Sequence, residues 1–430
     1  MDDPRYSKST KFLHRAEKSI PLGSQTFSKS RIQYPVGVSP LFINKAHGTY
    51  VWDIDGNKYI DLVNSLAAVT VGYRNRTIDG MVRKQMKKGT IFSLPGKLEA
   101  EVAELVIKTV PSAEMVRFAK NGSDATAAAI RLSRAYTNRD EIAICGYHGW
   151  QDWYIGSTTM NRGVPQAIIN LSHTFKYNDI DTLKSIFSSR PNKIAAVILE
   201  PMNSEYPRDN FLQEVKDLVK KNGSILIFDE TITGYRYSTG GAQLEFGVTP
   251  DLTTLGKGIA NGYPLSALTG KKEIMQELEK VFFSATFGGE LLSLAAAKAV
   301  IQMHLDSNIS SEIANVGLKI SSELETIIQT YKMSNLLNVS GHPSWKFLNW
   351  FGNHEVSASS LKTYFMQEMF KKGILVLSTH NNSLSLTAKI SDRVINTYGE
   401  VISDISKSLS DGSLLYKLQV DPVQPVIKLR

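Results

Sequence analysis

The chain has 430 residues, 42% of them hydrophobic and 21% charged, which is ordinary for a folded globular protein. This length exceeds the needs of one simple core and predicts two domains, or one large domain with a lobe. The formal net charge is +8, but the basic residues are scattered and the densest group, residues 83–88, has helical spacing. A solvated helix face explains this group better than a nucleic-acid site, and anionic small-molecule substrates also suit the excess charge.

The single cysteine, Cys145, lies in an apolar run. A disulfide framework is therefore excluded, a reducing compartment is favoured, and Cys145 is interpreted as a small buried hydrophobe. The first residues lack the layout of a signal peptide, and no apolar run approaches the ~18 residues that span a bilayer. We therefore predict a cytoplasmic protein with no membrane partner, no nucleic-acid partner and no metal site.

The first 45 residues open with a helical pattern and then carry prolines and glycines, which predicts an arm. Two short strands, 50–53 and 58–61, follow around a turn at Asp55-Gly56. From about 97 to 270, helices alternate with apolar runs that lack polar alternation. Such runs are typical of strands covered on both faces, in a mainly parallel sheet. The predicted strands are 115–118, 141–145, 194–199, 225–228 and 265–269, and the predicted helices are 98–109, 123–136 and 211–221.

The remainder of the chain has the pattern of a smaller α+β lobe. Helices are predicted at 290–305, 310–331, 359–372 and 391–408, with strands near 347–351, 373–377 and 384–387 and a tail from 410. We therefore predict an α/β protein with three segments. Residues 1–60 form the N-terminal arm and part of the small domain, 61–305 form the large domain, and 306–430 form the C-terminal part of the small domain.

Two polar groups stand at predicted strand ends, where ligands of parallel sheets bind. Asp229 directly follows an apolar strand and needs a cationic or hydrogen-bonding partner, although a helix cap or loop acid explains it equally well in isolation. Gly122 and Ser123 open an alanine-rich helix, whose free N–H groups suit an anion such as phosphate. Plain capping is the alternative for Ser123.

Further candidates follow other strands. Tyr147 and His148 lie between glycines in the run 146–150, which indicates a stacking platform or, equally, a packed aromatic loop. Glu200 is another acid at a strand end. Lys257 lies between two glycines, so a planar group could approach its amine, although a solvated loop lysine is the simpler interpretation of Lys257 alone.

These features together describe a site for pyridoxal 5'-phosphate (PLP). This cofactor needs a Schiff-base lysine, an acid on its pyridine nitrogen and an anion site. The acid keeps the nitrogen protonated, so the ring accepts the electrons released when the substrate Cα loses a proton. The amine of Lys257 is then the natural proton shuttle.

The motifs at 229–234 (DETITG), 250–252 (PDL) and 255–258 (LGKG) resemble those of the class III, fold-type-I aminotransferases. The resemblance covers residues 11–405 and is strongest to the branch that contains glutamate-1-semialdehyde aminomutase. It implies a large domain with a seven-stranded, mainly parallel sheet. It also implies that Lys257 forms the Schiff base, Asp229 pairs with the pyridine nitrogen, and the cofactor is further bound by Gly122, Ser123, Tyr147, His148, Glu200 and Thr231. Thr286, in the run 285–289, would reach the phosphate of a neighbouring subunit, which implies a homodimer with shared active sites.

The chain departs from these relatives at expected substrate positions. Lys29 replaces the arginine that binds the substrate carboxylate in the aminomutase, and Leu66 replaces a tryptophan. The gating loop is shortened to 157–165, which puts mutase chemistry in doubt. Glu205 matches the glutamate that pairs with a mobile arginine in ω-aminotransferases, but the arginine position falls near Ser385.

The sequence therefore predicts a PLP-dependent aminotransferase that exchanges an amine between a small-molecule donor and a keto or aldehyde acceptor in a ping-pong cycle. Polar replacements and the aromatic residues Trp150 and Trp153 suggest an oxo-sugar or nucleotide-linked sugar as acceptor. Two alternatives stay open: an aminomutase, and a non-catalytic relative whose only support is the basic charge. Intact Lys257 and Asp229 speak against the latter.

Overall fold

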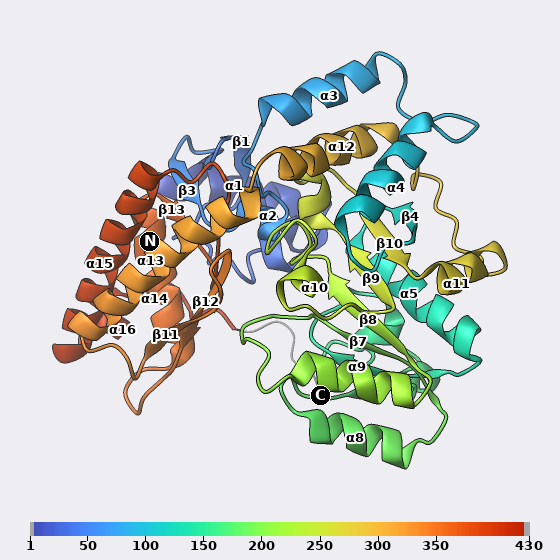
Figure 1. The fold of residues 1–430 in the computed structure, drawn as a ribbon. Coiled ribbons are helices and arrows are strands. Elements are labelled where there is room, and N and C mark those ends of the chain that lie inside the picture. Colours follow the sequence, from blue (N-terminus) through green and yellow to red (C-terminus); the bar gives the residue numbers. More distant parts are fainter. Residues whose placement is uncertain (1–3, 425–430) are drawn as a thin grey trace. The chain divides into compact units, whose positions relative to one another are not determined.

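Seven strands form the central sheet of residues 76–311 (Figure 1). The computed structural model describes residues 4–424, which divide into this unit and a second unit made of residues 4–75 and 312–424. The sheet order is β4-β10-β9-β8-β7-β5-β6. Only β10 runs antiparallel to its neighbours in this sheet, so the prediction of a mainly parallel sheet is confirmed. The strands are β4 (Met115–Ala119), β5 (Glu141–Cys145), β6 (Ser172–Thr174), β7 (Ile194–Leu199), β8 (Ile225–Glu230), β9 (Leu252–Leu255) and β10 (Ser266–Gly270).

Helices cover both faces of this sheet, because its strands are apolar on both sides. Every residue of β5, β7 and β8 is buried. Successive side chains of a strand point to opposite faces, so Ile142 and Ile144 pack with helix α5, whereas Ala143 and Cys145 pack with helices α8 and α9. The helices of this unit are α3 (Arg76–Met86), α4 (Lys97–Thr109), α5 (Gly122–Thr137), α6 (Asp152–Ile155), α7 (Gln166–Ile169), α8 (Ile180–Ser189), α9 (Phe211–Lys221), α10 (Ala242–Glu245), η4 (Lys257–Ala260), α11 (Lys272–Met275), η5 (Gln276–Glu279) and α12 (Leu291–Asp306).

The other unit contains two smaller sheets, ordered β1-β2-β3-β13 and β11-β12-β14. Its strands are β1 (Ile43–His47), β2 (Tyr50–Asp53), β3 (Lys58–Asp61), β11 (Leu337–His342), β12 (Trp345–Trp350), β13 (Ile374–Leu375) and β14 (Thr379–Asn381). Its helices are η1 (Pro4–Tyr6), α1 (Ser7–Ala16), η2 (Pro21–Gly23), η3 (Phe27–Lys29), α2 (Asn64–Ala67), α14 (Ala358–Lys371), α15 (Ala388–Ser410) and α16 (Leu414–Lys417), and α13 (Ile309–Thr330) belongs mostly to it.

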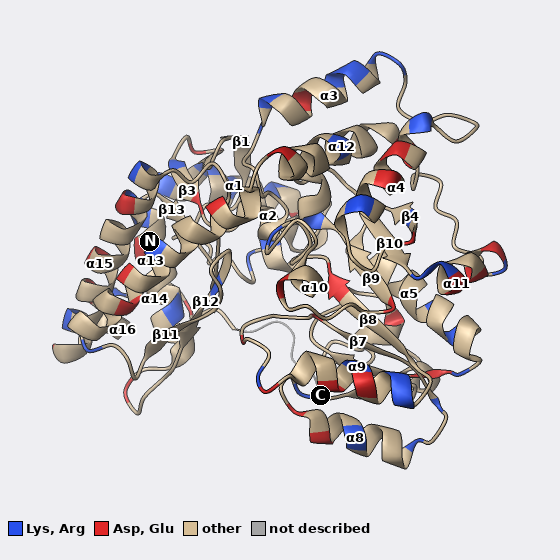
Figure 2. Ribbon diagram, in the orientation of Figure 1, with Lys and Arg blue, Asp and Glu red and all other residues tan. Residues whose placement is uncertain are grey.

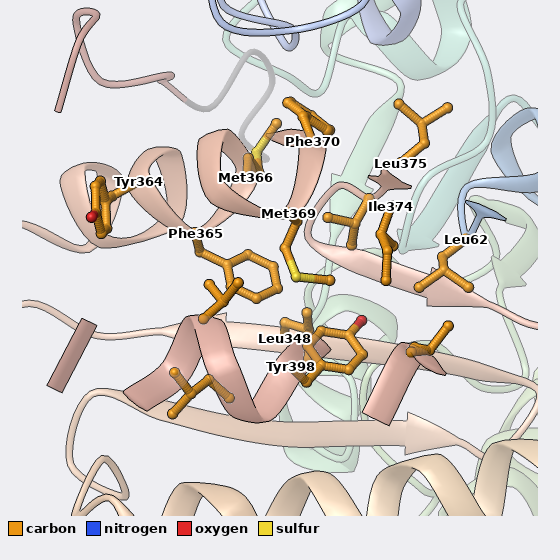
Figure 3. Close-up of a cluster of buried hydrophobic side chains, with 14 of the residues drawn as sticks. Leu62, Leu348, Tyr364, Phe365, Met366, Met369, Phe370, Ile374, Leu375 and Tyr398 are labelled. Carbon is orange, nitrogen blue, oxygen red and sulfur yellow. The ribbon is translucent and has the colours of Figure 1, made fainter. Parts of the chain in front are cut away.

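A large apolar core holds this second unit together (Figure 3). The stacked rings of Phe365 and Tyr398, with centroids 5.8 Å apart, join α14 to α15. Ile374 and Leu62 lie in the same core, so the N-terminal and C-terminal parts of the chain share one hydrophobic cluster. This sharing explains why segments so far apart in sequence form one unit.

The chain divides at slightly different places from those predicted. Residues 61–75 lie with the arm rather than with the large domain, because Leu62 donates its amide to the Leu375 carbonyl and Asn381 donates to Leu62. The second division falls after 311 rather than 305. The arm itself is packed, since Tyr34 and Val38 are buried.

The predicted strand at 384–387 is wrong. The alternation of Leu384 and Leu386 with serines imitates a strand, but these residues form a turn in which the Leu386 amide bonds the Ser383 carbonyl. The strand of this region is β14, a few residues earlier. Leu386 is still buried, so the apolar pattern here indicates core packing and not strand pairing.

Charged residues are spread over the helices, with Lys and Arg interspersed among Asp and Glu (Figure 2). In α3, Ile78 and Val82 are buried while Arg83 and Lys84 are exposed, which confirms the solvated helix face predicted for this basic group. None of the helices in the described part of the chain is both long enough and apolar enough to cross a membrane.

Candidate active site

The polar residues predicted at strand ends lie at one edge of the large sheet. β5, β7, β8 and β9 run parallel, so their carboxyl ends meet at the same edge. Each of these strands carries one predicted residue at or just after its end: His148 for β5, Glu200 for β7, Asp229 for β8 and Lys257 for β9. The sheet therefore brings together residues that are up to 109 positions apart in sequence.

Asp229 and His148 form the central pair. Asp229 Oδ2 lies 2.8 Å from His148 Nδ1, and His148 Nε2 lies 3.0 Å from the carbonyl oxygen of Cys145. A carbonyl oxygen only accepts hydrogen bonds, so Nε2 carries a proton. With Asp229 ionised, Nδ1 must also donate, and the His148 ring is then a buried cation.

The second oxygen of Asp229 is also fully engaged. Oδ1 accepts hydrogen bonds from the hydroxyls of Thr231 (2.6 Å) and Thr254 (2.9 Å) and from the Thr231 amide (3.1 Å). Burial alone would raise the pKa of Asp229. The hydrogen bond and the charge of His148, together with the two hydrogen bonds from Thr231, hold this pKa below its ordinary value. Asp229 is therefore a buried carboxylate that stays ionised.

Lys257 occupies a strained backbone position directly after β9. Its φ is +41°, in the left-handed region that disfavours residues with a Cβ. Burial lowers the pKa of its amine to about 8; Glu200 and Asp229 raise it, while buried Arg236 lowers it further. Roughly a tenth of the amine is consequently uncharged at pH 7, far more than for an ordinary surface lysine.

Glycines keep side chains out of the space around the start of α5. A Cβ on Gly149 would lie 2.2 Å from Ser123 Oγ. A Cβ on Gly122 or on Gly256 would lie 3.0 Å from the methyl group of Thr231, so Thr231 fits between these two glycines. The result is a backbone-walled cradle at a helix N-terminus, a setting that suits a phosphate group. The residues present therefore fit PLP.

Glu200 and Tyr147 border the same site. Glu200 is buried, which raises the pKa of its carboxyl group, and it accepts hydrogen bonds from the Tyr147 amide (3.1 Å) and from Asn203 Nδ2 (2.7 Å). Its contacts thus orient the loop after β5. The rings of Tyr147 and Trp150 stand exposed, at 52% and 65% of their surface.

Of the remaining predicted residues of this unit, Trp153 is buried in the core beside α5, while Thr286 and Glu205 lie at the surface. Thr286 is exposed, and so are the neighbouring Phe282 and Phe287. The carboxylate of Glu205 pairs with Arg208 at 2.8 Å and lines a cavity of about 550 Å³ that Glu200 also lines.

Two predicted substrate residues, Lys29 and Leu66, line one cavity of about 340 Å³ in the unit formed by the two chain ends. Asp61 and Tyr73, which were not singled out from the sequence, line this cavity too. The one signal for Asp61 was its place at the end of a short strand, and Tyr73 had none. Ser385, in the same unit, bonds the Val71 carbonyl at 3.2 Å and sits against Gly72.

Fold and site together describe an α/β protein with a buried carboxylate, a lysine of lowered pKa and a glycine-lined helix N-terminus at one sheet edge. Residues 33–405 match the family model described as Aminotransferase class-III. The chain belongs to this family, as the sequence motifs indicated.

Curated relatives agree over most of the chain. It is 34% identical to glutamate-1-semialdehyde 2,1-aminomutase of Cytophaga hutchinsonii over 433 residues, covering 92% of this chain and 98% of that protein. It is 32% identical to 3-aminobutyryl-CoA aminotransferase of Cloacimonas acidaminovorans over 385 residues, covering 88% and 92%. Among solved structures, the FumI protein of Sphingopyxis sp. MTA144 superposes with a TM-score of 0.88 at 23% identity over 97% of this chain and 99% of that one. This likeness confirms the fold.

Proposed function

We propose that this PLP-dependent aminotransferase moves an amino group from a small-molecule donor to a keto or aldehyde acceptor, with Lys257 and Asp229 as its catalytic residues. The observation that carries this proposal is the combination of a strained lysine, whose pKa is lowered to about 8, with an ionised buried carboxylate at the same sheet edge. A structural role explains neither the strain at Lys257 nor the complete desolvation of Asp229.

PLP, when bound, supplies the electron sink that makes the substrate Cα–H acidic. Gly122 and Ser123 would hold its phosphate at the start of α5, while Tyr147 and Thr231 would lie against its ring. The carboxylate of Asp229 would hold a proton on the ring nitrogen, and the His148 cation keeps that carboxylate ionised. Glu200 would act through the Tyr147 backbone, which it already binds.

Lys257 Nζ is the base in this proposal. A general base works best when its pKa lies near the operating pH. With a pKa of about 8, the amine can take a proton from the substrate Cα and return it to a neighbouring atom.

The enzyme is further proposed to be a cytoplasmic homodimer. Exposed Phe282 and Phe287 flank the Thr286 segment, which supports its covering by a second copy. Thr286 would then contribute to the partner's phosphate site. Buried Cys145, with a pKa raised to about 12 by burial, suits a reducing compartment.

For the acceptor, the cavity that contains Lys29 favours one of two classes. The sequence suggested an oxo-sugar or nucleotide-linked sugar. The cavity walls, however, are largely apolar, including Leu41, Phe42, Val63 and Leu66. Among the described residues that line the cavity, Lys29 is the one cation and Asp61 the one carboxylate. Such walls suit an oxo acid, or an acyl thioester, with a short apolar chain better than they suit a polyhydroxylated molecule. We propose that this second class is the acceptor.

A half-reaction screen tests these proposals. Donor amines are mixed with the PLP-loaded protein, and the loss of the bound-PLP absorbance is followed. The amino form of the enzyme is then offered 3-oxobutanoate and an oxo-sugar in parallel, with recovery of the absorbance as readout. Recovery with the oxo-sugar alone would contradict the apolar-acceptor proposal. The aminomutase alternative predicts 5-aminolevulinate from glutamate semialdehyde with no added donor.

A further inference from the structure

Lys120 and Glu290 form an ion pair beside the start of α5. Lys120 Nζ lies 3.0 Å from Glu290 Oε2 and 3.2 Å from the hydroxyl of Ser293, and the side chains of the pair are each only 17% exposed. Partly buried pairs of this kind are screened by water and salt much less than surface pairs are. The pair joins residues that are 170 positions apart within the large unit.

The backbone of Lys120 is bound to the phosphate cradle. Lys120 and Asn121 connect β4 to the start of α5, which opens with Gly122 and Ser123. Asp124, in the first turn of α5, accepts hydrogen bonds from the amides of Lys120 (3.3 Å) and Asn121 (2.8 Å). A displacement of Lys120 is therefore transmitted to the start of α5.

Glu290 is bound in the same way to the start of α12. Its Oε1 accepts the amide of Leu292 at 2.7 Å, and its Oε2 accepts the amide (3.2 Å) and the hydroxyl (2.7 Å) of Ser293. Burial would raise the pKa of Glu290. The hydrogen bonds from Ser293, Lys120 and the Leu292 amide hold this pKa below its ordinary value, so Glu290 is an ionised cap of α12.

The segment 285–289, which contains Thr286, leads directly into Glu290 and lies against the end of β4. An added Cβ on Gly288 would lie 2.7 Å from the carbonyl oxygen of Phe118 in β4, so the two backbones approach closely with no side chain between them. One short stretch of chain, residues 118–123, therefore both contacts this segment and carries the cradle.

The position of Lys120, rather than its charge, is what the ion pair can contribute to the cradle. A free lysine beside a phosphate site attracts the phosphate by its charge. Here Nζ is bound to the carboxylate of Glu290, and the pair has no net charge. Its effect on the cradle is therefore mechanical: it holds the start of α5 and the cap of α12 together.

We propose that Lys120 is a positioning residue of the cofactor site, which joins the phosphate-binding start of α5 to the Thr286 segment through Glu290. PLP bound at the cradle then also orders residues 284–290, the segment that would reach the partner's phosphate site. The inference rests on the proposed function, because the anion at the cradle is taken to be the phosphate of PLP.

The test compares Lys120→Met with a matched control, Lys298→Met. Lys298 lies in α12, and its Nζ binds the carboxylate of Glu101 in α4 at 2.6 Å, with side chains 34% and 26% exposed. Each variant therefore loses one lysine–carboxylate pair that α12 or its cap makes, and only the first pair adjoins the cradle. Glu290→Gln and the double variant Lys120→Met/Glu290→Gln complete a cycle that isolates the interaction between the two residues.

Two quantities are measured on the full-length proteins, after denaturant titration has shown that each variant is folded. One is the dissociation constant for PLP, and the other is hydrogen exchange of the backbone amides in residues 284–290 with and without saturating PLP. We expect the dissociation constant to rise about tenfold in Lys120→Met, in Glu290→Gln and in the double variant alike, and to stay unchanged in Lys298→Met. PLP should slow the exchange of 284–290 in the wild type and in Lys298→Met, but not in Lys120→Met.

Two results would overturn the proposal. Tighter PLP binding by Glu290→Gln would show that Lys120 acts through its charge, because the freed cation would then attract the phosphate. Equal slowing of exchange by PLP in Lys120→Met and the wild type would show that the pair is structural only. A wild-type protein that binds no PLP would instead contradict the proposed function, and exchange in the PLP-free proteins would still decide whether Lys120 holds the segment.

Discussion

His148 donates a hydrogen bond to Asp229 over 2.8 Å while its other ring nitrogen is bound to the Cys145 carbonyl at 3.0 Å. The imidazole is held between two groups that only accept, with its side chain fully buried. With Asp229 ionised, the His148 ring donates to its carboxylate and to no other group of the described residues except the Cys145 carbonyl. This pairing explains how a carboxylate can be buried at the end of an apolar strand and stay charged.

Replacing His148 by leucine removes this donor. Burial raises the pKa of Asp229 and His148 lowers it, so this pKa should rise when His148 is removed. A lost hydrogen bond to a charged group costs about 1.5–3 kcal/mol, so we expect the half-reaction rate to fall by about 10- to 100-fold. The acid limb of the pH–rate profile should move to higher pH. Asn203→Ala is the control variant. An unshifted acid limb in His148→Leu would contradict the pairing of His148 with Asp229.

Lys257 should react as a base near neutral pH. In the cofactor-free protein, its labelling by an acylating reagent should reach half its maximum near pH 8, the value to which burial lowers its pKa. The exposed Lys184, whose pKa is raised by Asp181, serves as a control in the same sample. Peptide mapping by mass spectrometry gives both midpoints. Equal midpoints for the two lysines would show that the Lys257 amine is solvated.

Gly149→Ala tests the phosphate cradle. The added Cβ would lie 2.2 Å from Ser123 Oγ at a φ of +104°, so Ser123 must move. Gly163 has a similar φ of +93° with nothing within 4 Å of an added Cβ, so Gly163→Ala carries the backbone strain alone. We expect the dissociation constant for PLP to rise at least about tenfold in Gly149→Ala, equivalent to ~1.4 kcal/mol. Equal PLP binding by both variants would remove Ser123 from the site.

The buried side chain of His304 should lower the free energy of unfolding in acid. It is 4% exposed, neither ring nitrogen has a hydrogen-bond partner within the described residues, and burial lowers its pKa to about 4. An unfolded histidine titrates near 6.5, so stability is fully present above ~6.5 and is lost as the pH falls from there towards 4, by about 3 kcal/mol.

His304→Leu should therefore flatten the pH dependence of the free energy of unfolding between pH 6.5 and 4, measured by denaturant titration of the PLP-loaded protein. It should also raise stability at neutral pH, because two buried polar atoms disappear. The exposed His14→Leu is the control. If the free energy of unfolding of His304→Leu fell in acid as much as that of the wild type, another group would be the cause.

Much of the large unit could be predicted from local pattern. Helix α9 has the predicted bounds of 211–221, and the runs that became β5, β7 and β8 were identified because continuous apolar strands need cover on both faces. The placing of acids and glycines at strand ends indicated one site. Which of these residues pair, such as His148 with Asp229, depends on the order of strands in the sheet.

The left-handed turn of helix α2, in which all four residues have a positive φ, could not have been predicted. Asn64, Ser65, Leu66 and Ala67 carry no glycine signal, and the contacts that hold them come from Tyr73 and from Asn381, which is 317 residues away from Asn64. Likewise, Leu384 and Leu386 alternate as in a strand, but tertiary packing places them in a turn. The local sequence pattern predicts well which residues are buried. The backbone conformation of these two turns depends on long-range contacts, which the local pattern does not contain.

The most direct test of the central claim is the site at which PLP becomes fixed to the protein. The PLP-loaded enzyme is reduced with borohydride, digested, and the lysine that carries the pyridoxyl group is located by mass spectrometry. We expect modification of Lys257 and none in Lys257→Ala, which should also lack the bound-PLP absorbance. Modification of another lysine, such as Lys120 beside Glu290, or unchanged labelling in Lys257→Ala, would contradict the role of Lys257 as the Schiff-base residue.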